Sequence, residues 1–251
     1  MSMDSTTAMH LRDDAGSDPA QRLAVIGASR RAVMVEGASH AALQPWIDRS
    51  WRRCLSAGRR PEQPVAFDVL SASASRRALE AGQPLIAAAT PVLHGLARAM
   101  ESTRYFAILT DANGVVVAVD GPIDHGDRRA QLITRIGVDL SEASVGTTAI
   151  GAALNELTPV WLHRGEHFFD DTSVYSCAGA PIFDGAGRCA GMLDLTGVET
   201  RERPELRHLV AQSACAIGDA LVRAAPHALC LRLTWPGLAA SSDAAGLVCV
   251  D

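Results

Sequence analysis

The chain has 251 residues, of which 48% are hydrophobic and 20% charged, and its formal net charge is −5. This length and apolar content suffice for one large domain with a buried core, or for one domain with extensions. The acidic balance argues against a generic nucleic-acid surface, which is normally basic, so we expect no direct nucleic-acid binding. No apolar run is long enough to span a bilayer, and the N-terminus lacks the apolar core of a secretory signal. We therefore expect a cytoplasmic protein without membrane contact.

The first hundred residues read as a polar tail followed by helices. Residues 1–20 are polar and aperiodic, which predicts a disordered N-terminus. Residues 21–100 form a predicted helical N-terminal extension, with helical periodicity over residues 21–57 and again over residues 72–100. Glycine and proline residues are expected to break or kink the second helical region, at Gly82, Pro84 and Pro91.

Residues 101–225 combine strand and helix signals. Two pairs of apolar runs flank the turn sequences Asp-Ala-Asn-Gly at 111–114 and Asp-Gly-Ala-Gly at 184–187, which predict two β-hairpins. A helix rich in small residues is predicted over residues 141–157 and a last long helix over 204–223. Together they predict an α+β domain, an antiparallel sheet of about six strands with helices packed outside and flanking N- and C-terminal helices.

Several segments resemble the GAF domain of acetoin-catabolism-type, sigma-54-dependent transcriptional activators. They are SWRRCLSAG at 50–58, LTDANGVV at 109–116, SEASVGTTAIGAAL at 141–154, GEHF at 165–168 and YSCAGAPIFDGAGRCAGMLDLTG at 175–197. The resemblance covers about residues 40–225. Thr148 stands where the family usually has asparagine, and Leu140 and Tyr175 stand where tryptophan is common. Residues 226–251 form a tail in which GLVCVD at 246–251 resembles the opening strand of a PAS domain, so the tail is expected to begin a PAS-like domain.

The resemblance implies a sensory module that binds a small-molecule metabolite, is not an enzyme, requires no cofactor and acts through a homodimer on an output domain. Such activators continue into an ATPase domain and a helix-turn-helix domain. Neither is visible in this chain, which has no lysine and therefore no GxxxxGK[ST] phosphate loop. We expect it neither to hydrolyse ATP nor to bind specific DNA.

Polar and aromatic residues gather around residues 160–196, where we expect the ligand site. The candidate ligand-binding residues are Phe106, Val145, Thr148, Trp161, His163, His167, Phe168, Tyr175, Cys177 and Asp194. Strand alternation places Tyr175 and Cys177 on one face of their strand. Asp194, an acid within an apolar strand, is expected either to accept backbone N–H groups or to contact a ligand.

Three other interpretations use the same region. His163, His167 and Cys177 are candidate metal ligands, because imidazole and thiolate bind zinc or iron. Cys177, with Cys189, is a candidate for a thiol-dependent reductase. A dimerisation or adaptor module, whose cavity is filled by its own side chains, would bind no ligand.

Overall fold

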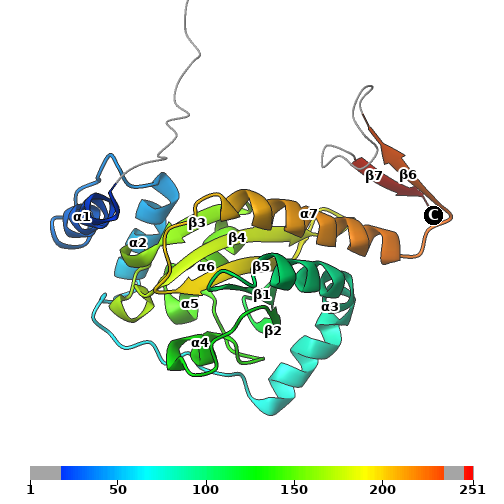
Figure 1. Ribbon diagram of the computed structural model, residues 1–251, viewed down its shortest axis with the longest axis horizontal. Helices are drawn as coiled ribbons and strands as arrows, with labels where there is room; N and C mark the ends of the chain where they lie inside the picture. Colours follow the sequence, from blue (N-terminus) through cyan, green and yellow to red (C-terminus); the bar gives the residue numbers. More distant parts are fainter. Residues whose placement is uncertain (1–17, 235–245, 251) are drawn as a thin grey trace, which may run out of the picture.

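The computed structural model describes residues 18–234 and 246–250. Its main sheet has five antiparallel strands in the order β2-β1-β5-β4-β3. The strands are β1 (Tyr105–Asp111), β2 (Val116–Asp120), β3 (Val160–His163), β4 (Tyr175–Phe183) and β5 (Cys189–Val198). Helices cover both faces of this sheet (Figure 1). The α+β class is confirmed, with five strands in the main sheet rather than about six.

Both predicted hairpins form at their turn sequences. Asp111 closes the β1–β2 turn by accepting from the backbone N–H groups of Asn113 and Val115. Asp184 does the same in the β4–β5 turn with Ala186 and Arg188. These carboxylates stabilise the turns because their local hydrogen bonds replace those that the ladder cannot supply.

Two long helices, α3 (Ala72–Ala99) and α7 (Leu206–Ala224), cover one face of the sheet. The apolar stripe of α7 is buried there through Leu206, Val210 and Ile217. α3 is a continuous helix with Pro84 and Pro91 inside it, and it bends along its length (Figure 1). The prolines therefore do not end the helix, which matches the kinked alternative.

The opposite face of the sheet carries shorter helices, α4 (Arg128–Ile133), α5 (Glu142–Val145) and α6 (Ala149–Glu156). The continuous helix predicted over residues 141–157 is wrong. α5 ends at Gly146, whose φ of 70° is left-handed. The side chain of Thr148 then caps α6 by accepting from the Gly151 N–H at 3.2 Å. A left-handed glycine and a side-chain cap together terminate one helix and start the next.

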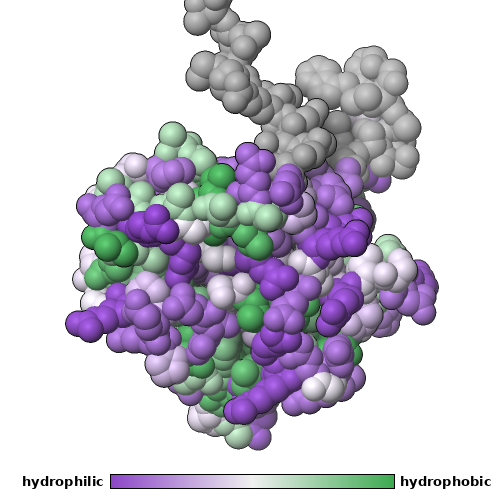
Figure 2. Space-filling model, turned by 60° about the vertical axis from the view of Figure 1, so that its left-hand side comes forward, coloured by the Kyte–Doolittle hydropathy of each residue, from purple (hydrophilic) through white to green (hydrophobic). Residues whose placement is uncertain are grey.

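The N-terminal helices pack at the β3 side of the sheet. α1 (Pro19–Arg30) continues into the π-helical turn η1 (Arg31–Val35), and α2 (Pro45–Ser56) follows after a break. Trp51 and Ile47 of α2 are fully buried in a small core with Phe168 and Phe169. On the face shown in Figure 2, hydrophobic and hydrophilic residues are interspersed.

A separate two-stranded sheet follows α7 and consists of β6 (Leu229–Leu233) and β7 (Gly246–Val250). It lies at the C-terminal end of α7, away from the main sheet (Figure 1). Of residues 1–20, which were predicted to be disordered, 1–17 lie outside the described part of the chain. The prediction is wrong for Pro19 and Ala20, because α1 begins there with the Asp18 side chain as its N-cap. Within that part, we find no helix with both the length and the apolar character needed to cross a membrane.

Candidate functional site

A small cavity of about 30 Å³ lies between the sheet and the α5–α6 segment. Its walls are largely apolar, but several polar side chains reach it. The lining residues are Phe67, Ile108, Ile133, Leu140, Val145, Thr148, Ala149, Ile150, His167, Thr172, Tyr175, Cys177, Asp194 and Thr196. A cavity of this size holds about one or two water molecules, so a larger guest requires the walls to move.

Close backbone packing fixes the roof of the cavity. A Cβ atom on Gly179 of β4 would lie 2.8 Å from the carbonyl oxygen of Ala149, so α6 rests directly on the strand. A Cβ atom on Gly151 would lie 2.8 Å from the backbone nitrogen of Glu142, which holds α5 against α6. Glycine is needed at both positions because backbone atoms cannot yield as a flexible side chain can.

Asp194 is the most unusual polar residue of the cavity, and it is only 1% exposed. Oδ2 accepts a short hydrogen bond from the Thr196 hydroxyl, whereas Oδ1 has no partner within the described residues. Burial raises the pKa of Asp194 from 3.8 to about 7, against the lowering effect of Thr196. Of the two alternatives expected for this carboxylate, backbone N–H partners are not found among the described residues, and contact with a ligand stays a prediction. Near neutral pH, Asp194 exists partly as a carboxylic acid.

His167 supplies the second unpartnered polar atom. Its Nδ1 lies 2.9 Å from the carbonyl oxygen of Arg164. A carbonyl only accepts, so Nδ1 carries the proton and Nε2 keeps a lone pair. Nε2 is buried and has no hydrogen-bond partner in the part of the chain that the structure describes. Burial lowers the pKa of His167 to about 4, so the ring is neutral at pH 7.

Six of the ten predicted ligand-binding residues line this cavity. They are Val145, Thr148, His167, Tyr175, Cys177 and Asp194. Tyr175 and Cys177 share the cavity side of β4, as strand alternation predicted. The Tyr175 hydroxyl donates to the carbonyl of Arg129 at 3.0 Å, which ties α4 to the same wall.

The other four predicted residues lie elsewhere. Trp161 and His163 of β3 pair with Ala178 and Ser176, so they occupy the opposite face of the sheet. His163 Nδ1 lies 2.8 Å from the Ser176 hydroxyl. Phe168 packs against the N-terminal helices. Phe106 lies on the cavity side of β1 but fills the core next to the cavity.

Sequence reasoning missed several lining residues. Thr196 is two positions from Asp194 on the same strand, so period-two alternation was the available signal. Ile108 pairs directly with Asp194 across β1 and β5, a register that the sequence does not state. Phe67 comes from the segment before α3, far away in the chain, and no local pattern marks it.

The cavity does not favour thiol chemistry. Cys177 is buried, and desolvation together with the nearby Asp194 carboxylate raises its pKa well above the ordinary value of 9, although Thr196 lies 3.3 Å from its sulfur. A nucleophilic cysteine needs the thiolate, which this environment disfavours.

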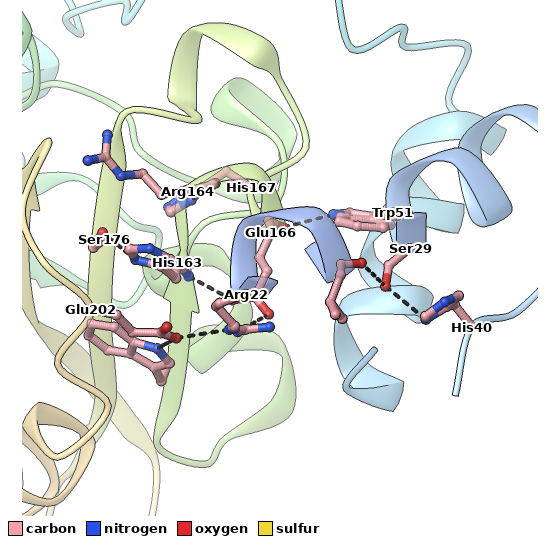
Figure 3. A network of polar contacts seen from close by, with 12 residues as sticks. Arg22, Ser29, His40, Trp51, His163, Arg164, Glu166, His167, Ser176 and Glu202 are labelled. Carbon is pink, nitrogen blue, oxygen red and sulfur yellow. Dashed lines mark hydrogen bonds and ion pairs between the residues drawn. The ribbon is translucent and has the colours of Figure 1, made fainter. Parts of the chain in front are cut away.

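The N-terminal helix α1 contacts the segment that carries His167. Arg22 donates to the Glu166 carboxylate at 2.7 Å and to Glu202 at 3.1 Å (Figure 3). Glu166 in turn accepts from the backbone N–H of His163 at 2.7 Å, and its carbonyl accepts from the Trp51 indole at 2.9 Å. The turn η2 (Arg164–Glu166) is therefore held from both α1 and α2.

Known proteins resemble this chain over the part that contains the main sheet and its helices. The family model described as the MimR N-terminal domain matches residues 30–219. The chain is 29% identical over 177 residues to the acetoin dehydrogenase operon transcriptional activator AcoR of Bacillus subtilis, covering 70% of this chain and 29% of that protein. It is 28% identical over 194 residues to the propane 2-monooxygenase operon transcriptional activator MimR of Mycolicibacterium smegmatis, covering 70% and 33%. The chain thus spans about a third or less of these relatives' length.

Among solved structures, the E. coli DhaR(N)–DhaL complex aligns with a TM-score of 0.67 at 18% identity, covering 72% of this chain and 62% of that one. At this identity the likeness establishes the fold. The fold, the cavity and the relatives together define a GAF-like sensory domain of transcriptional activators. Within that class, the chain belongs to the MimR N-terminal domain family.

Proposed function

We propose that this domain binds a small, neutral, oxygen-containing metabolite in the cavity under α5 and α6 and reports its presence to an output domain. The observation that carries the proposal is that two residues lining the cavity each have a buried polar atom without a partner within the described residues, His167 Nε2 and Asp194 Oδ1. Leaving such groups unpaired costs about 1–3 kcal/mol each, and a ligand that pairs with them recovers part of that cost. If the cavity were filled only by the protein's own side chains, nothing would offset the cost of these two unpaired polar atoms.

The chemistry of these two atoms selects the ligand class. His167 Nε2 is an acceptor and requires a hydroxyl donor, whereas the Asp194 carboxyl, with its pKa of about 7, either donates or accepts. The remaining walls are largely apolar and include Ile108, Ile133 and Val145. Short-chain alcohols, diols and hydroxyketones offer this combination of one or two oxygens on a small hydrocarbon. An anion would be disfavoured next to the Asp194 carboxylate.

The names of two relatives mention molecules as small as these short-chain oxygen compounds. AcoR is named for an acetoin dehydrogenase operon and MimR for a propane 2-monooxygenase operon. Acetoin is a four-carbon hydroxyketone, and oxygenation of propane at its second carbon gives a three-carbon alcohol. We infer that this chain takes a ligand of comparable size.

The signal would leave the cavity through the segment between His163 and Thr172. Arg30 of α1 donates to the backbone carbonyls of Gly165, His167 and Phe168. A ligand that binds the His167 ring and shifts its position therefore also affects α1. This produces a signal provided that the ligand-bound and ligand-free conformations differ in free energy. In the whole regulator this change would reach a sigma-54-type output domain through a homodimer. The apolar stripes of α2 and α7 are covered within the chain, so the dimer would use other surface.

The experiment is thermal unfolding of the dialysed protein with 2-propanol, 1,2-propanediol, acetoin and acetate at several concentrations. Ligand binding to the native state raises the melting temperature with concentration. We expect a shift with a neutral compound, none with acetate, and loss of the shift in Asp194→Asn and His167→Phe. Asp68→Asn and His208→Gln change exposed residues and serve as controls. Equal shifts in all variants would refute the assignment of the cavity.

A further inference from the structure

The hairpin β6–β7 brings two cysteines face to face. Cys230 and Cys249 are directly opposite each other in its antiparallel register. Both are half-buried, whereas the alternating neighbours Leu229, Leu231, Val248 and Val250 are exposed. The cysteine side of the hairpin faces the end of α7, since Cys249 Sγ lies 3.8 Å from the carbonyl oxygen of Val222 and Arg232 lies 3.9 Å from Asp219.

A histidine joins this pair from the connection between α7 and β6. His227 Nδ1 lies 2.7 Å from the carbonyl oxygen of Ala225. Because the carbonyl can only accept, this contact places the ring proton on Nδ1 and leaves the Nε2 lone pair available. Metal-binding histidines commonly donate their other ring N–H to a backbone carbonyl in this way, which fixes the tautomer and the ring orientation.

The three side chains meet the requirements of a metal site. Among the residues that the structure describes, His227, Cys230 and Cys249 are the group whose metal-ligating atoms all lie within 4.8 Å of one another. Zn–S bonds of about 2.3 Å and Zn–N bonds of about 2.0 Å place tetrahedral ligand atoms roughly 3.5–3.8 Å apart. His163, His167 and Cys177, the ligands considered from the sequence, do not form such a group.

We propose that His227, Cys230 and Cys249 bind a thiophilic divalent cation of the zinc type, with the fourth position taken by water or an exogenous ligand. Two thiolates and one imidazole form a soft donor set that favours zinc over magnesium or calcium. The bound cation would fasten both strands of the hairpin to the segment that leaves α7. It would thereby fix the direction in which the chain continues beyond the sensory domain. This site is separate from the ligand cavity and does not depend on the function proposed for it.

The test uses the full chain, purified under reducing conditions and dialysed with Co²⁺ or Zn²⁺. We expect one metal per chain by elemental analysis and, with Co²⁺, the intense thiolate charge-transfer and tetrahedral d–d absorption bands. Cys230→Ser and Cys249→Ser should lose the thiolate bands, and His227→Gln should weaken Zn²⁺ binding about tenfold or more in a chelator competition. Cys189→Ser, Cys215→Ser and His208→Gln are the matched controls and should bind as the parent does.

Two results would overturn the proposal. One is metal binding that survives unchanged in both the Cys230→Ser and the Cys249→Ser variants. The other is a Cys230–Cys249 disulfide, found by peptide mass mapping, that persists in the reducing buffer, because the register also suits a cross-strand disulfide. Far-UV circular dichroism of each variant distinguishes a lost ligand from a lost fold.

Discussion

Arg30 donates a hydrogen bond of 2.6 Å to the carbonyl oxygen of His167, the residue whose ring lines the cavity. The same guanidinium bonds the carbonyls of Gly165 and Phe168 and forms an ion pair with Asp170 at 2.7 Å. One arginine of the N-terminal helix therefore holds the backbone on both sides of a cavity residue. This contact connects the sensory cavity with an element outside the sheet.

Replacing Arg30 with methionine should destabilise the fold by about 2–4 kcal/mol, because three carbonyls lose their donor while the methylene packing is largely kept. Arg49→Met removes an exposed ion pair with Glu156 and should cost about 0–1 kcal/mol. Urea unfolding of both variants measures the difference. Equal stabilities would mean that Arg30 does not hold the segment.

The Asp194 carboxyl predicts a specific pH dependence. Its pKa is about 7 in the folded state against an ordinary value of 3.8, so the native state binds the extra proton between these values. The contribution of Asp194 to the free energy of unfolding is therefore complete below about pH 4 and is lost as the pH rises through about 7. The slope of this loss is up to about 1.4 kcal/mol per pH unit. The stability of the parent relative to Asp194→Asn should fall over this range.

Comparison with Asp194→Asn is needed because two histidines act in the opposite direction. Burial lowers the pKa of His163 and of His167 from 6.5 to about 4. The contribution of these two histidines to the free energy of unfolding is present above about pH 6.5 and is lost as the pH falls towards about 4. Both histidines remain in the variant, so their effect cancels in the difference. Urea titrations across this pH range give that difference, and a pH-independent value would contradict a raised Asp194 pKa.

Replacing Gly179 or Gly95 with alanine gives two matched variants with opposite expected effects on stability. Gly179→Ala places a methyl group 2.8 Å from the Ala149 carbonyl oxygen and 2.7 Å from Met192 Cε, so α6 must move away from β4. We expect a loss of about 1–3 kcal/mol and a weaker ligand response. Gly95 lies inside α3, and a Cβ atom added there would meet nothing within 4 Å, so Gly95→Ala should gain about 0.5–1 kcal/mol. Thermal unfolding that ranks the two in the reverse order would contradict the packing described.

The sequence was informative where local chemistry decides the structure. The turn sequences Asp-Ala-Asn-Gly and Asp-Gly-Ala-Gly define the two hairpins. Period-two alternation correctly placed Tyr175 and Cys177 on one face of β4, and this face lines the cavity. The interpretation of residues 141–157 failed because small residues sustain a helical pattern, whereas the left-handed Gly146 ends the first helix. His163 and His167 are close in the chain but lie on opposite sides of the sheet, since β3 ends at His163 and the chain then turns. Register and long-range partners such as Phe67 depend on tertiary packing that the sequence does not state.

The most direct test of the ligand site is the ¹⁵N spectrum of the His167 ring, assigned by comparison with His167→Phe. In the unliganded protein at neutral pH, Nδ1 should carry the proton and Nε2 should show the shift of an acceptor without a partner. Saturating acetoin or 2-propanol should move Nε2 towards the hydrogen-bonded value and leave Nδ1 protonated. An Nε2 resonance that stays unchanged, while the same compound raises the melting temperature, would place the ligand elsewhere and contradict the proposed site.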